Sequence, residues 1–386
     1  MQPSRSRAAN LRITIFVMLV ASVVALTGPS AIAAETSARE GILIDTSTGA
    51  VLLDKNADQS MPPASMSKIM TVYLVMERLK DGRLSLDDKF LVSEKAWRMG
   101  GSKMFVKVGN RIRIEDLLRG VIIQSGNDAC IVLAEGIGGT EEAFAEEMTR
   151  KAAELGMTGS TFANATGWPD PNQRMTARDL ATLAQRIIQD FPEYYYFFSE
   201  TEFTWNDIRQ PNRNPILYAS VGADGLKTGH TEEAGYGLTA SAVQGDRRLI
   251  LVLNGLDSLK ARAEESERLL SWGFREFGNY ALVKPGEVVD EAPVWLGETP
   301  TVGAVVPDGL TLTLPRKARA DMQVKVIYES QVTAPVTAGQ EVGKLVVSAP
   351  DTAPIVVPLL AATSVGRLGP IGRITAGLRF LIFGAQ

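Results

Sequence analysis

Ser65 and Lys68 are the first pair of residues in this sequence whose types and spacing could support chemistry. Residues three positions apart share one face of a helix, so their side chains would lie one turn apart. Lys68 precedes an apolar run (69–76), where loss of water would lower its pKa from about 10.4 toward neutrality. A neutral lysine can deprotonate a serine, which makes Ser65 a candidate nucleophile and Lys68 its base. The pair alone is a weak signal, because a capping serine beside a surface lysine gives the same pattern.

A second candidate group lies at the end of the predicted helix over 114–125. Ser125 and Asn127 place a small hydroxyl beside an amide, and together they could relay a proton and hold a peptide amide. A helix end with ordinary capping residues would have the same composition. The group therefore gains weight only in combination with the first pair.

The third candidate group, 225–231, enters a predicted strand. Lys227 could bind a carboxylate there, and Thr228 could orient it. Gly229 would let a substrate approach the backbone closely. The three groups occur together and in the order of a known serine acyl-transfer signature, which they resemble, and jointly they are a strong signal.

Composition excludes several other classes of protein. The formal net charge of −4 argues against general nucleic-acid binding, which needs a basic surface. The single histidine, His230, argues against a zinc peptidase and leaves a Ser-His-Asp site only if His230 is its base. We expect no metal and no cofactor. Cys130, the single cysteine, cannot form a disulfide within the chain and is interpreted as a buried small side chain.

The first 33 residues have the pattern of a secretory signal peptide. Arginines precede an apolar run (13–26), and the small residues Ala31 and Ala33 fit an Ala-x-Ala cleavage site. The apolar run is shorter than the ~20 residues of a spanning helix, which favours a cleaved signal over an uncleaved membrane anchor. The sequence therefore predicts export, with 1–33 removed.

The elements that would position the candidate residues have strands at both ends and helices between them. A hairpin over 41–53 begins this unit, and strands over 236–242 and 248–253 come near its end. Helices are predicted at 65–79, 114–125, 129–135, 141–155, 176–189 and 262–277. This order predicts an α+β domain over 34–288 in which helices cover one antiparallel sheet.

The remainder of the chain has a different residue pattern. From 289 to 363, short Val, Thr and Leu runs alternate with Pro and Gly turns, which predicts a small all-β domain. The last segment, 364–386, has a helical pattern whose apolar residues fall on one arc of roughly 100°, with Arg373 and Arg379 off it. These apolar residues are Ile371, Ile374, Leu378, Leu381 and Ile382. Such a helix could lie in a membrane interface, or it could dock on its own β domain.

Four stretches, 63–68, 119–130, 208–214 and 224–236, resemble the low-molecular-mass penicillin-binding proteins. More narrowly, they resemble the D-alanyl-D-alanine carboxypeptidases of peptidase family S11, and the resemblance covers nearly the whole chain. It implies a penicillin-binding-protein or serine β-lactamase-like transpeptidase domain, followed by the β domain and the amphipathic helix. It also implies that the terminal D-alanine of peptidoglycan stem peptides is released through an acyl-enzyme. β-lactam antibiotics would act as covalent inhibitors by acylating the same serine.

The resemblance also assigns roles to individual residues. Ser65 matches the acylated nucleophile and Lys68 its base, Ser125 and Asn127 match the second motif, and Lys227 matches the third. These five residues are the expected catalytic set.

The expected substrate-binding set is Thr228, Gly229, His230, Arg213 and Arg262. The family's oxyanion hole implies that the backbone N–H groups of Ser65 and His230 bind the developing oxyanion. Arg213 and Arg262 match basic residues near the substrate carboxylate, and the alternative for each is a surface ion pair.

The family's C-terminal helix implies a periplasmic enzyme anchored to the outer face of the inner membrane. Two alternatives stay open at this point. A class A β-lactamase deacylates through a glutamate-activated water, but the matching region here, 161–169, contains no glutamate. A non-catalytic penicillin-binding wall sensor that kept the fold is the other alternative.

Overall fold

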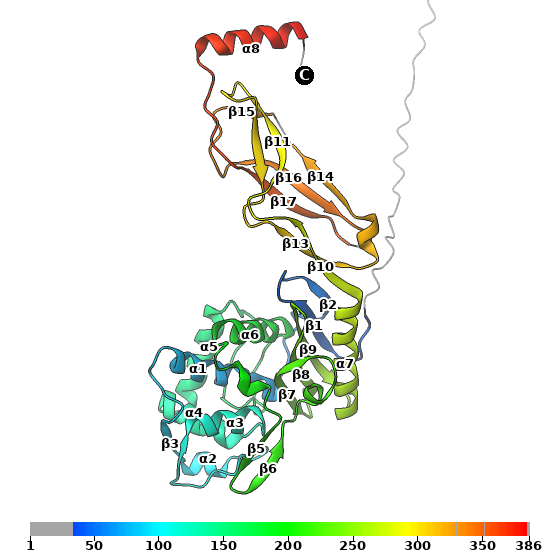
Figure 1. The fold of residues 1–386 in the computed structure, drawn as a ribbon. Helices are drawn as coiled ribbons and strands as arrows, with labels where there is room; N and C mark the ends of the chain where they lie inside the picture. Colours follow the sequence, from blue (N-terminus) through cyan, green and yellow to red (C-terminus); the bar gives the residue numbers. More distant parts are fainter. Residues whose placement is uncertain (1–33, 329–330, 351, 384–386) are drawn as a thin grey trace, which may run out of the picture.

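The computed structural model describes residues 34–328, 331–350 and 352–383, which form two lobes and a C-terminal helix. The lower lobe combines a sheet with helices, the upper lobe consists mainly of strands, and the helix lies at the far end of the upper lobe (Figure 1). The predicted signal peptide lies outside the described residues.

A five-stranded antiparallel sheet forms the centre of the lower lobe, with the strand order β2-β1-β9-β8-β7. The predicted hairpin over 41–53 is confirmed, because β1 pairs with β2, and so is the predicted strand pair, because β8 pairs with β9. β7 has a partner on one side only and is an edge of the sheet. The strands are β1 (Glu40–Asp45), β2 (Val51–Lys55), β7 (Ala223–Thr231), β8 (Gly235–Gln244) and β9 (Arg247–Leu256).

Helices cover both faces of this sheet (Figure 1). Successive residues of a strand point to opposite faces, so Ile42 joins one hydrophobic cluster and Leu43 the other. The cluster of Leu43 includes Leu269 and Leu270 of α7 (Leu259–Glu276). The cluster of Ile42 is formed mainly by the other helices, which are α1 (Lys68–Lys80), α2 (Glu94–Arg98), α3 (Ile114–Ile122), α4 (Asn127–Gly138), α5 (Glu141–Glu154) and α6 (Ala177–Asp190).

Several predicted helix boundaries differ from the structure by two or three residues, and two of these differences involve candidate site residues. The helix expected to begin at Ser65 is a 3-10 turn, η1 (Ala64–Ser67), followed by α1. The helix expected over 114–125 ends at Ile122, since Ser125 has a φ of +60°, which cannot continue a right-handed helix. Short elements complete the lobe: β3 (Lys89–Leu91), β4 (Arg111–Arg113), η2 (Tyr195–Phe198), β5 (Glu202–Trp205), β6 (Ile208–Pro211) and η3 (Pro215–Tyr218).

The β-rich part begins directly after α7 and therefore earlier than the predicted boundary at 288/289. β10 (Phe277–Val283) pairs with β13 (Leu310–Pro315), and η4 (Ala318–Asp321) follows β13. A six-stranded sheet with the order β14-β16-β17-β12-β11-β15 forms the rest. Its strands are β11 (Val288–Trp295), β12 (Thr301–Val305), β14 (Gln323–Ile327), β15 (Val332–Thr333), β16 (Glu341–Ser348) and β17 (Ile355–Ala361).

The two lobes meet where the β1–β2 hairpin contacts the β10–β13 pair. Asn279 Nδ2 donates to Ser47 Oγ at 2.6 Å. Beneath this contact, the buried Arg247 forms an ion pair with the buried Asp45 at 2.9 Å and donates to Phe277 O at 2.8 Å. An ion pair that also bonds to the first residue of β10 fixes the start of the upper lobe against the sheet.

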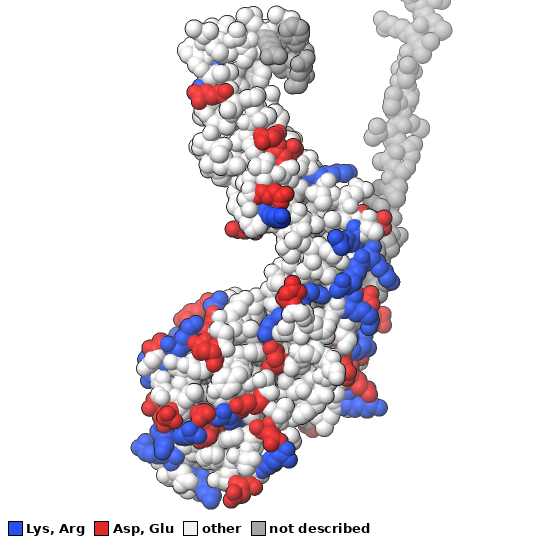
Figure 2. Space-filling view, viewed as in Figure 1, with Lys and Arg blue, Asp and Glu red and all other residues white. Residues whose placement is uncertain are grey.

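The last helix, α8 (Pro370–Phe383), projects from the upper lobe (Figure 1). Its apolar residues are exposed: Ile371 by 82%, Leu381 by 81% and Leu378 by 53%. Docking of this apolar side on the β domain, one of the two expectations, is therefore wrong. On the face drawn in Figure 2, the described residues at this end of the molecule show few charged side chains, whereas positive and negative side chains are interspersed over the lower lobe. Among the described residues, no helix combines the length and the apolar character needed to cross a bilayer.

Candidate active site

Ser65 lies in the η1 turn, which packs between α1 and the edge strand β7. The turn is closed by a hydrogen bond from Ser67 Oγ to Ala64 O at 2.9 Å. Met66 and Ser67 are buried, whereas Ser65 is partly exposed. The hydroxyl of Ser65 is thus accessible at the surface of an otherwise buried turn.

Lys68, the first residue of α1, lies directly below this hydroxyl. The Nζ atom of Lys68 donates to Ser65 Oγ at 2.8 Å and to Asn127 Oδ1 at 2.7 Å. A third hydrogen bond goes to the backbone oxygen of Thr166. Burial lowers the pKa of Lys68 to about 8. A considerable fraction of Lys68 is therefore neutral near physiological pH, as a base for Ser65 requires.

Asn127 connects Lys68 to the neighbouring loop at the start of α4. Its Nδ2 donates to Gly100 O at 2.9 Å, and its backbone N–H donates to Ser102 O at 2.8 Å. The next residue, Asp128, accepts hydrogen bonds from three successive backbone N–H groups, at residues 104, 105 and 106. The start of α4 thereby fixes both the amide that binds Lys68 and the loop beside it.

Ser125 lies between α3 and α4 and is 2% exposed. Its hydroxyl makes no hydrogen bond within the part of the chain that the structure describes. The structure thus brings Ser65, Lys68 and Asn127 into direct contact and leaves the Ser125 hydroxyl without a partner. A hydroxyl in this state can take part in proton transfer once a substrate supplies the missing contact.

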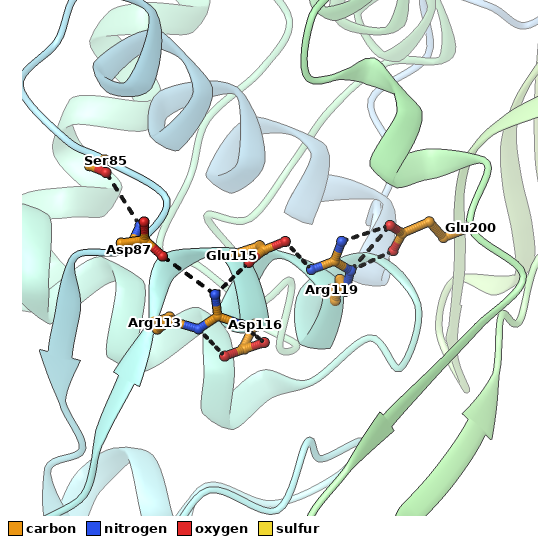
Figure 3. A network of polar contacts seen from close by, with 7 residues as sticks. All are labelled: Ser85, Asp87, Arg113, Glu115, Asp116, Arg119 and Glu200. Atoms are coloured by element: carbon orange, nitrogen blue, oxygen red, sulfur yellow. Dashed lines mark hydrogen bonds and ion pairs between the residues drawn. The ribbon is translucent and has the colours of Figure 1, made fainter.

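The helix before Ser125 is anchored by an extended polar network, which Figure 3 shows. Arg119 of α3 donates to the carboxylate of Glu200 from two nitrogens, at 2.8 and 2.9 Å, and to Glu115 at 2.7 Å. Its guanidinium also lies 5.0 Å from the centroid of the Phe197 ring. The network continues from Glu115 through Arg113 to Asp87 and Asp116. It fixes α3 and hence the start of the turn that holds Ser125.

Lys227 of β7 is buried and has no carboxylate partner among the described residues. Its Nζ donates to Thr228 O at 3.3 Å. Burial, together with repulsion from Lys68, lowers the pKa of Lys227 well below its usual range. Because an uncompensated buried cation is unfavourable, an anionic group would be attracted to this position.

Gly229 brings β7 close to the nucleophile. A Cβ at this position would lie 3.0 Å from Pro63 O and 3.1 Å from Met66 Cγ, closer than side chains normally approach. His230 follows with an exposed side chain that stacks on Tyr236, with ring centroids 4.0 Å apart. Among the described residues His230 has no hydrogen bond to Ser65, so the geometry does not support His230 as its base.

Neither of the two expected arginines forms an ion pair with any described residue, so the surface ion-pair alternative has no support. Arg213 donates to Ser102 Oγ in the loop beside Asn127. Arg262 of α7 is 6% exposed, its Cζ lies 5.9 Å from the Tyr236 ring centroid, and its Nε lacks a partner. Burial lowers the pKa of Arg262 to about 10.

Sequence reasoning missed two positioning features, the Thr166 carbonyl and Asp128. A backbone carbonyl has no sequence signal, and an acidic residue in the first turn of a helix looks like an ordinary helix-dipole preference. The prediction that Cys130 is a buried small side chain is confirmed, and burial raises the pKa of its thiol to about 12.

The fold is that of the penicillin-binding proteins. The structure of the D-alanyl-D-alanine carboxypeptidase DacD from Francisella tularensis matches 86% of this chain and 95% of its own, with a TM-score of 0.79 and 32% identity. The structure of penicillin binding protein 5 from Haemophilus influenzae matches 86% of this chain and 99% of the Haemophilus chain, with a TM-score of 0.76 and 36% identity.

Sequence comparison narrows the class. The profile of the D-alanyl-D-alanine carboxypeptidase family, peptidase family S11, matches residues 27–258. That of the C-terminal domain of penicillin-binding protein 5 matches residues 277–367. DacC, a D-alanyl-D-alanine carboxypeptidase of Escherichia coli K12, is 43% identical over 83% of this chain and 84% of its own. The chain belongs to the D-alanyl-D-alanine carboxypeptidase family.

Proposed function

We propose that this chain, a D-alanyl-D-alanine carboxypeptidase by family, releases the terminal D-alanine of peptidoglycan stem peptides through an acyl-enzyme on Ser65. The observation that carries this proposal is the 2.8 Å hydrogen bond between Lys68 Nζ and Ser65 Oγ in a site that lowers the lysine pKa to about 8. A nucleophile and its base are thus in contact, and the base can be neutral near pH 7.

Acylation follows from this arrangement. Lys68 takes the hydroxyl proton as Ser65 Oγ attacks the carbonyl between the two D-alanines. The backbone N–H groups of Ser65 and His230 stabilise the oxyanion, and Ser125 together with Lys227 passes a proton to the departing amine. Water then attacks the ester, which frees Ser65 and releases the shortened peptide.

The terminal carboxylate explains the cations without acidic partners. Lys227, Arg213 and Arg262 have no ion pairs in the described part of the chain, and Thr228 lies next to Lys227 on the edge strand. A carboxylate bound there would satisfy these donors, and an arginine can hold it through two parallel hydrogen bonds. β-lactam antibiotics also carry a carboxylate beside a reactive carbonyl, which fits covalent binding at the same serine.

The test is mass spectrometry with benzylpenicillin, followed by an assay of D-alanine release from a pentapeptide. We expect one covalent adduct, on Ser65, and catalytic release of D-alanine, with both lost in Ser65→Ala. Absence of the adduct would refute the mechanism. An adduct without D-alanine release would favour the wall sensor, and rapid multiple turnover of penicillin without D-alanine release would favour a β-lactamase.

We also propose that the enzyme is exported and held at the outer face of the inner membrane by α8. The exposed apolar side of α8 and the low charge around it (Figure 2) suit insertion into a bilayer interface. Arg373 is exposed and would be attracted to anionic lipid. α8 lies at the far end of the upper lobe, whereas α1 and β7, the elements beside Ser65, belong to the lower lobe (Figure 1), so membrane contact would leave the site accessible.

Removal of residues 370–386 is expected to release the protein from membranes with little change in D-alanine release. Sedimentation with vesicles that contain anionic lipid measures the first effect, and the pentapeptide assay measures the second. Leu378→Glu, on the apolar side, should weaken sedimentation, whereas Ala376→Glu, on the opposite side, should change it much less. Continued sedimentation of the truncated protein would contradict the anchoring role.

A further inference from the structure

A narrow cavity lies beside the nucleophile turn, between the segment 167–173 and the end of β7, where Thr231 and Glu233 line it. Ala64, next to Ser65, forms part of its wall, and Thr231, next to His230, forms another part. Its volume of about 10 Å³ admits little more than one water-sized group. A ligand could therefore place only a single polar atom inside the cavity, and its neighbouring atoms would lie at the rim.

Gln173 lines this cavity and presents an unused hydrogen-bond donor. The side chain is 2% exposed, and its Oε1 accepts hydrogen bonds from the backbone N–H groups of Ala163 at 2.7 Å and Asn164 at 3.2 Å. Its Nε2 is buried without a partner. Because a buried donor without an acceptor is unfavourable, this position favours a ligand that supplies an oxygen.

Two carboxylates lie at the rim of the same cavity. Asp170 is partly exposed and uses Oδ1 to accept from Asn172 N at 2.7 Å. Glu233 is exposed and uses Oε1 in an ion pair with Arg174 at 2.9 Å. The second oxygen of each carboxylate has no partner within the described residues. The rim can therefore bind a group that donates several hydrogen bonds, such as an ammonium.

The direction of the bound peptide brings its third residue to this cavity. If the terminal carboxylate lies near Lys227 and the reacting carbonyl near Ser65 and His230, the rest of the peptide continues along β7 toward Thr231. The residue before the two D-alanines in peptidoglycan stems is a diamino acid, with an amine on its side chain. Trp168 lines the cavity and is 47% exposed, so its ring offers an apolar surface to the aliphatic part of that side chain.

We propose that the cavity and its rim form a subsite for the third residue of the stem peptide, an inference that rests on the proposed function. Asp170 and Glu233 bind the side-chain ammonium. Gln173 Nε2 donates to an oxygen of the same residue, which is its backbone carbonyl or, in a diamino dicarboxylic acid, its side-chain carboxylate. The subsite selects peptides whose third residue carries a free amine.

The experiment compares kcat/KM for two pentapeptides that differ only in acetylation of the third residue's side-chain amine. We expect a roughly fivefold to tenfold preference for the free amine, the size of one or two charged contacts at a partly exposed site. The Asp170→Asn/Glu233→Gln double variant should lose this preference. Glu232→Gln, a neighbouring exposed position that does not line the cavity, should keep it.

Two further measurements separate the possible failures. Acylation by benzylpenicillin, which has no third residue, should be unchanged in the double variant. If both peptides are cleaved equally by the wild type, or if the double variant keeps the preference, the subsite is refuted while the carboxypeptidase activity stands. If neither peptide yields D-alanine, the proposed function fails first. A peptide whose side-chain carboxylate is amidated identifies the oxygen: reduced kcat/KM assigns the carboxylate to Gln173, and unchanged kcat/KM assigns the backbone carbonyl.

Discussion

Lys68→Ala is expected to lower the rate at which benzylpenicillin acylates Ser65 by roughly 10²–10⁴ near neutral pH, the usual contribution of a general base. Lys68 Nζ lies 2.8 Å from Ser65 Oγ and, when neutral, can accept the hydroxyl proton. Among the described residues, no other basic side chain forms a hydrogen bond with Ser65. Stopped-flow measurement of adduct formation tests this. A variant that still acylates at a near wild-type rate would exclude Lys68 as the base.

The pH dependence gives an independent check. Because burial lowers the pKa of Lys68 to about 8, the neutral, basic form increases as the pH rises through this value, and the acylation rate should rise with it. Lys68→Ala should lose this rise. Lys68→Arg keeps a cation that cannot be deprotonated and should be similarly slow. His230→Asn keeps the backbone N–H and should retain most of the activity.

Gly167→Ala is expected to destabilise the protein by about 2–5 kcal/mol, as the sum of left-handed backbone strain and overpacking. Gly167 has a φ of +75°, and an added Cβ would lie 1.9 Å from Ala64 O and 2.5 Å from Ser67 Oγ. Both atoms belong to the turn that carries Ser65, so the fraction that folds should also acylate slowly. A displacement of about 1 Å at a nucleophile can cost roughly 10² in rate. Chemical denaturation and adduct formation measure the two effects.

Gly82→Ala is the matched control. Gly82 has a φ of +77°, but no atom lies within 4 Å of an added Cβ. Its cost is therefore the backbone strain alone, about 1–2 kcal/mol, and acylation should be unaffected. Equal loss of stability in the two variants would mean that overlap with the nucleophile turn does not add to the destabilisation by Gly167→Ala.

Much of the lower lobe could be predicted from the sequence because its elements have regular patterns. The β8–β9 strands are apolar and flanked by turn residues, and α6 has an amphipathic pattern that begins at the capping residue Thr176. The contact of Lys68 with Ser65 also follows from residue spacing, since three positions correspond to about one helical turn.

The rest depends on contacts between distant segments. The hydrogen bond from Lys68 to Thr166 O joins residues far apart in sequence and uses a backbone atom. The left-handed conformation of Ser125 is held by its surroundings, because serine does not favour it. The predicted start of the upper lobe, at 289, is too late, because β10 begins at Phe277 directly after α7, with no loop to mark the boundary.

The junction between the lobes determines how freely the site can move. A flexible linker would let Ser65 sample many heights and orientations above a surface that holds α8. The buried Arg247–Asp45 pair and its bond to Phe277 instead connect the lobes without such a linker. With α8 on a membrane, the upper lobe would be a rigid spacer between the membrane and the lower lobe (Figure 1). The enzyme would then trim peptides in one thin layer of the wall, at a set distance from the lipid.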